Sequence, residues 1–71
     1  MNNILINAME KAGYYYDSIN SYDTWIIFYG NYCAQMKFLS WDDVLNWLKG
    51  VVFDDAEISD SVEKVLNSAN L

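Results

Sequence analysis

The chain has 71 residues, and its ten acidic side chains against four lysines give a net charge of −6, so it is long enough for one small domain. This charge repels nucleic acid and anionic membranes, and the composition therefore argues against direct binding to either. The sequence has no histidine, no arginine and a single cysteine, Cys33, which excludes an internal disulfide and a cysteine–histidine zinc site and leaves little chemistry for catalysis.

The composition is typical of a folded protein. Apolar residues make up 54% of the chain, and three tryptophans, six tyrosines and three phenylalanines can fill a core. There is no proline and no internal repeat, which favours a single domain over residues 1–71. No apolar run approaches the roughly 20 residues that span a bilayer, and the first residues lack the basic segment of a signal peptide. We therefore expect a soluble cytoplasmic protein without cofactor or metal.

The first element expected is a helix of about ten residues, followed by a short strand. Asn2 or Asn3 can cap the start of the helix, and Gly13 lies where a helix commonly ends in the left-handed conformation. The aromatic residues 14–16 favour a strand, and the turn-forming residues 17–23 favour a loop after it. Apolar residues recur at helical spacing in the first segment: Ile4, Leu5, Ala8, Met9 and Ala12.

A β-hairpin is expected next, with TWIIFY and YCAQMKF as its strands. Gly30 and Asn31 between them tolerate the positive φ that a two-residue turn requires. Alternate residues of the second strand are apolar, and the side that carries them should face the core. Cross-strand partners share a face of the sheet, so the turn also fixes which residues of the first strand face the core. The pairs that follow are Trp25 with Met36, Ile27 with Ala34 and Tyr29 with Tyr32, with Phe38 on the same side.

The opposite side of this hairpin supplies a candidate binding surface. Ile26, Phe28 and Cys33 alternate onto it, and exposed apolar patches often mark partner surfaces. Trp47 lies about 60° outside the apolar stripe of the helix that follows, so part of its ring should be exposed too. The alternative is that the last helix or the chain end folds over this side. Cys33 is expected to be an ordinary strand residue, since the chain has no histidine to activate it.

A second helix is expected from Trp41 to Gly50. The hydroxyl of Ser40 can accept a hydrogen bond from the amide near Asp43, and the carboxylates of Asp42 and Asp43 lie at the positive end of the helix dipole. The core stripe of this helix consists of Trp41, Val44, Leu45 and Leu48.

A third helix is expected after a polar connection over residues 54–60, with Ser59 or Asp60 as its cap. Residues 51–53 are too few to assign. The element order α-β-β-β-α-α predicts a small two-layer α+β domain, with an antiparallel sheet of two or three strands and helices on one face. The apolar stripe of the third helix consists of Ile58, Val62, Val65, Leu66 and Ala69.

Seven carboxylates and only one lysine lie in the segment 42–63. Neighbouring acids on a helix point in different directions, which makes the adjacent pairs poor acid–base dyads. The spacing also lacks the central glycine and the twelfth-position acid of an EF-hand calcium loop, so we expect no metal site. A dense and ordered acidic row would instead resemble the phosphates of DNA. The residues are Asp42, Asp43, Asp54, Asp55, Glu57, Asp60 and Glu63.

The strings GYYYDSINSYDTW and FLSWDDVLNWL resemble small uncharacterised proteins encoded on bacterial conjugative transposons and prophages. The resemblance covers about residues 13–48 and implies a mobile-element origin and a bacterial cytoplasm, but no active-site residue. Our first hypothesis is a non-enzymatic module, a monomer or weak homodimer, that docks an unidentified protein partner through aromatic and apolar surface. The alternative is an acidic mimic that occupies the nucleic-acid-binding site of a host protein.

Overall fold

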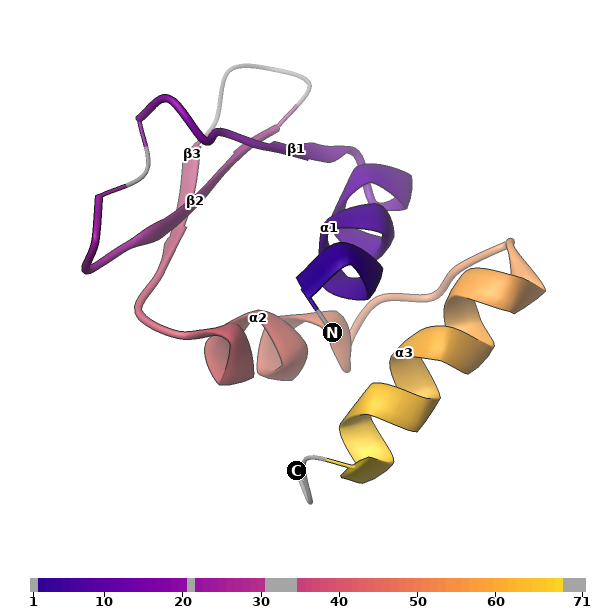
Figure 1. The fold of residues 1–71 in the computed structure, drawn as a ribbon. Helices are drawn as coiled ribbons and strands as arrows, with labels where there is room; N and C mark the ends of the chain where they lie inside the picture. Colours follow the sequence, from indigo (N-terminus) through magenta and orange to yellow (C-terminus); the bar gives the residue numbers. More distant parts are fainter. Residues whose placement is uncertain (1, 21, 31–34, 69–71) are drawn as a thin grey trace.

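The computed structural model describes residues 2–20, 22–30 and 35–68 and has the expected α+β architecture (Figure 1). Its three strands form one antiparallel sheet in the order β1-β2-β3. The predicted fold class and element order are confirmed. The elements are α1 (Asn2–Lys11), β1 (Tyr14–Tyr16), β2 (Ile26–Gly30), β3 (Gln35–Phe38), α2 (Trp41–Leu48) and α3 (Ala56–Ser68).

The helices lie on one side of the sheet. Helix α1 packs against β1 and against both other helices, and α2 packs against β3. Figure 1 shows α1 between the sheet and α3, so α3 covers the helices and not the strands. The opposite face of the sheet, which we call the outer face, is left without a helix.

Two local signals in the sequence act as predicted. Gly13 has a φ of 95° and its amide donates to the carbonyl of Glu10 at 3.0 Å, which ends α1. Ser40 is extended, with φ −152° and ψ 164°, and its Oγ accepts a hydrogen bond from the amide of Asp43 at 3.2 Å. Helix α2 therefore begins at the predicted residue, and it ends at Leu48, ahead of Gly50.

Helix α3 begins earlier than predicted. The Oδ1 atom of Asp55 accepts hydrogen bonds from the amides of Glu57 at 3.0 Å and Ile58 at 3.3 Å. The backbone carbonyl of Asp55 accepts from the amide of Ser59 at 3.0 Å. Asp55 is thus the N-cap, and the prediction of Ser59 or Asp60 as the cap is wrong. A carboxylate placed just before the first free amides satisfies them, which lets the helix start upstream of its apolar stripe. Ala69 lies outside the described residues.

The hairpin pairs in a different register from the predicted one. Met36 lies opposite Phe28, whereas the two-residue turn would have placed it opposite Trp25, three residues away. The last described pair is Tyr29 with Gln35, so residues 30–34 separate the two partners. A slip by an odd number of residues exchanges the faces of one strand relative to the other. The predicted turn residue Asn31 and the predicted core residues Tyr32 and Ala34 lie outside the described residues.

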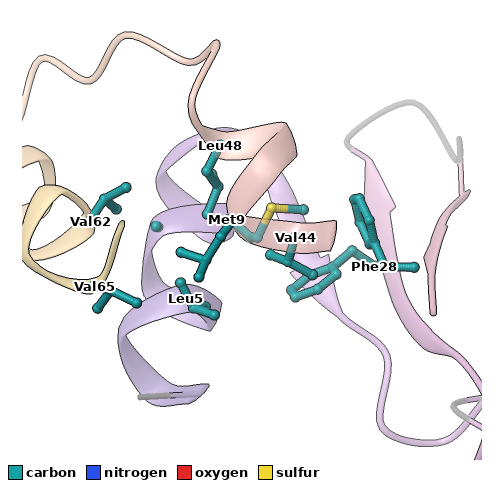
Figure 2. Packing of buried hydrophobic residues seen from close by; sticks show 10 residues of the cluster. Leu5, Met9, Phe28, Val44, Leu48, Val62 and Val65 are labelled. Atoms are coloured by element: carbon teal, nitrogen blue, oxygen red, sulfur yellow. The ribbon is translucent and has the colours of Figure 1, made fainter. Parts of the chain in front are cut away.

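The core lies between the sheet and the helices, with Phe28 at its sheet end. Phe28 is completely buried, and its ring lies 5.4 Å from Tyr16, 6.2 Å from Phe38 and 6.3 Å from Trp41, measured between ring centroids. Figure 2 shows Met9 and Val44 between Phe28 and the valines of α3. The helices contribute Leu5, Ala8, Met9, Val44, Leu45, Leu48, Val62 and Val65 to this cluster.

Candidate functional site

The residues Ile26, Phe28 and Trp47, predicted as an apolar patch, do not form an exposed surface. Phe28 is fully buried, and Ile26 packs against the core cluster, because the observed register turns both toward the helices. Trp47 is partly buried, and its ring packs edge-on against Tyr14 at 5.3 Å and Phe38 at 6.5 Å. The expected exposure of Phe28 is therefore wrong, and Ile26 and Trp47 serve the core. Cys33 lies outside the described residues.

The outer face of the sheet carries the odd-numbered strand residues. Tyr15, Tyr29 and Gln35 form one row across the three strands, and Ile27 and Lys37 form a row beside it. Ile27 is only 2% exposed although it lies outside the main core cluster. Side chains therefore pack over the sheet on this side too, without a helix to cover it.

Most of the exposed large apolar side chains lie on the outer face or in the segments next to its strands. Among the described residues, seven large apolar side chains are exposed. Five of them lie on the outer face, in the connection from β1 to β2, or directly after β3. Trp25 directly precedes Ile26, and Leu39 directly follows Phe38. Because Ile26 pairs with Phe38, Trp25 and Leu39 lie at the same end of the hairpin. We call these five residues the outer surface: Tyr15 (53% exposed), Ile19 (91%), Tyr22 (70%), Trp25 (39%) and Leu39 (66%).

A polar network attaches the β1–β2 connection to the sheet. Asp17 Oδ1 accepts hydrogen bonds from the amides of Ile19 at 3.1 Å and Asn20 at 3.0 Å, and its Oδ2 accepts from Asn20 Nδ2 at 2.8 Å. The hydroxyl of Tyr29 accepts from Asn20 Nδ2 at 3.3 Å and from Gln35 Nε2 at 2.9 Å. The network joins the end of β1, the connection, β2 and β3. It holds in place the loop that carries Ile19.

The same contacts keep Asp17 ionised. The side-chain amide of Asn20 lowers the pKa of Asp17 most, while burial works in the opposite direction. The backbone amides of Asn20 and Ile19 and the hydroxyl of Tyr29 lower this pKa further. The shape of the loop therefore depends on a carboxylate that stays charged near neutral pH.

The seven acidic residues predicted as a possible surface do not gather in one place. Asp55 caps α3 and its Oδ2 lies 4.0 Å from Nζ of Lys11, so it is already engaged. Figure 1 shows α2 starting beside the sheet and α3 on the far side of α1. Within the described ranges, no three acidic or cysteine side chains are arranged to hold a metal ion. The first turn of α2 carries Asp42 and Asp43, the connection carries Asp54 and Asp55, and α3 carries Glu57, Asp60 and Glu63.

Two shallow hollows of about 450 and 460 Å³ lie next to each other between α1 and α3. Both are bordered by Ser61 and Lys64; Ile4 lines the first, and Glu57 lines the second. Ser61 and Lys64 lie three residues apart on α3, and no hydrogen bond in the described part of the chain joins them.

Comparison with models of protein families, with curated proteins and with solved structures finds no match for this chain. In the part of the chain that the structure describes, no helix is both long and apolar enough to cross a membrane. The residues of the outer surface are therefore the basis for the function proposed below.

Proposed function

We propose that this chain is a small non-enzymatic module that docks a protein partner through its outer surface. The observation that carries the proposal is that five exposed large apolar side chains lie on the outer face or in the segments next to its strands. Tyrosine and tryptophan, which supply three of the five, are enriched at protein interfaces because they bury much area with few rotatable bonds. Exposed apolar surface is a common feature of sites that bind protein partners.

The polar network supports this role by ordering the loop before binding. Fixing a flexible side chain at an interface costs about 0.5 to 1.5 kcal/mol, and loop ordering adds to that. Asp17 and Tyr29 already hold the loop against the sheet through Asn20. The partner therefore meets a surface whose shape is largely set in advance.

The acidic mimic has less support. A mimic of duplex DNA needs a dense charged row, since DNA carries one charge per roughly 1.7 Å of its axis. The carboxylates here are divided between two helices and a connection, and Asp55 is engaged by backbone amides and Lys11. A bacterial mobile-element origin and a cytoplasmic location belong to the proposal and depend on the resemblance of residues 13–48.

The test is affinity isolation from cells that naturally contain the protein, using a matched pair of variants. Ile19 and Val52 are both branched aliphatic side chains and are 91% and 92% exposed, but only Ile19 belongs to the outer surface. We expect the double variant Ile19→Ser/Tyr22→Ser to lose the partner and Val52→Ser to keep it. Recovery of the same partner by the double variant would contradict the proposal.

The dependence of binding on ionic strength distinguishes apolar docking from the acidic mimic. Docking through apolar area should persist when salt is raised from about 50 to 200 mM, since salt screens exposed charges and not apolar contacts. A loss of affinity of about a hundredfold or more over this range would favour the acidic mimic.

A further inference from the structure

The backbone orientation of each strand follows from one hydrogen bond. The amide of Asp17 donates to the carbonyl of Ile27 at 2.9 Å, so the backbone groups of Ile27 point toward β1. Successive residues of an antiparallel strand point their backbone groups to opposite sides. Those of Phe28 therefore point toward β3, and those of its partner Met36 point back toward β2.

The next residues along β3 consequently direct their backbone groups out of the sheet. The amides and carbonyls of Gln35 and Lys37 point to the edge where the sheet ends, since β3 is the last strand in the order. No backbone hydrogen bond between described residues occupies this edge. The edge at β1 is less suited to pairing because β1 has only three residues and packs against α1.

The side chains along this edge define the chemistry of a matching strand. Gln35 and Lys37 are exposed on the outer face, and exposed Leu39 follows them. The one ion pair in the described part of the chain is Lys11 with Asp55, so no ion pair there engages Lys37. A carboxylate opposite Lys37 would form a cross-strand pair of opposite charges, which stabilises a sheet.

We propose that β3 pairs with an extended segment of the partner protein that places an aspartate or glutamate opposite Lys37. This inference rests on the proposed function and names how the partner would contact the module. The added strand would lie next to Leu39 and the outer face, so backbone pairing and apolar docking would act on one partner. A second copy of this chain offers Lys37 no carboxylate. Two-fold pairing centred on Lys37 sets two ammonium groups opposite each other, and pairing centred on Met36 sets Lys37 opposite Gln35.

The experiment uses a displayed library of random twelve-residue peptides selected on the intact protein. We expect enriched peptides to share an acidic residue flanked, two positions away, by apolar residues. For the tightest synthetic peptide, replacing that acid with lysine should weaken the Kd about tenfold, and Lys37→Glu should restore binding of the lysine peptide. Lys49→Glu, at an exposed lysine after α2, is the matched control and should change nothing.

Methylation of the peptide nitrogens tests the backbone pairing directly. Methyl groups on the alternate amides that face β3 should abolish binding, and methyl groups on the other amides should be tolerated. The proposal is overturned if no peptide is enriched, if Lys37→Glu leaves charge preference unchanged, or if a chain dimer seen by sedimentation competes with the peptide. None of these results would contradict docking through Ile19 and Tyr22, which the affinity isolation tests separately.

Discussion

Replacing Phe28 with alanine is expected to lower the free energy of unfolding by about 3 to 5 kcal/mol. The ring is completely buried and packs against Tyr16, Phe38 and Trp41, which come from three different elements. Because those neighbours are held by β1, β3 and α2, they can close the cavity only in part. A domain of 71 residues has about 4 to 10 kcal/mol of stability in total, so the variant should be close to unfolded at 37 °C.

Urea denaturation followed by tryptophan fluorescence and circular dichroism measures this loss. Phe28→Leu is the control for volume and should cost under about 1.5 kcal/mol. Trp25→Ala tests the opposite face of β2 and should cost under about 2 kcal/mol, since that side chain is partly exposed already. If Trp25→Ala were more damaging than Phe28→Ala, the faces of β2 would be reversed and the hairpin would have the register of a two-residue turn.

Three further predictions follow from particular contacts. Trp47→Ala should lower stability by about 2 to 3 kcal/mol in thermal melts, because the half-buried ring packs on Tyr14 and Phe38. Asp55→Ala should cost about 1 kcal/mol in urea denaturation through loss of the α3 cap, whereas exposed Asp54→Ala should cost almost nothing. The lowered pKa of Asp17 means that its contribution is present above the ordinary value of 3.8 and is lost as pH falls below it. The stability difference between the wild type and Asp17→Asn should therefore be constant from about pH 5 to 7 and shrink toward pH 3, as measured by urea denaturation at each pH.

The order of the elements could be predicted because its signals are local. Gly13 ends α1 through its own backbone conformation, and Ser40 caps α2 through an amide three residues away. Both contacts join residues that are close in the sequence, so neither depends on which distant segments pack together. The start of α3 was harder to predict, because Asp55 and Ser59 are both residues that cap helices well.

The hairpin register could not be predicted from its turn residues alone. Gly30 and Asn31 fit a two-residue turn, but the observed pairing of Tyr29 with Gln35 leaves a longer connection. Burial decides the register instead, because it brings Phe28 and Phe38 together over the helices. Polarity alone could not orient β2, because Trp25 and Ile27 on one side are as apolar as Ile26 and Phe28 on the other.

One local error therefore placed Ile26 and Phe28 on the wrong face of the sheet. An odd slip turned Phe28 inward and left Trp25 on the outer face. The loop residues Ile19 and Tyr22 were missed for another reason. Their position depends on the hydrogen bonds of Asn20 with Asp17 and Tyr29, and the bond to Tyr29 joins residues distant in the sequence.

Photocrosslinking in cells that naturally contain the protein tests the docking surface most directly. A photoreactive phenylalanine analogue replaces Tyr22 in one variant and Val52 in another, since both side chains are exposed and only Tyr22 belongs to the outer surface. We expect a discrete crosslinked partner from position 22 and none from position 52. Crosslinking of a partner from position 52 alone would place the interface elsewhere and contradict docking through the outer surface.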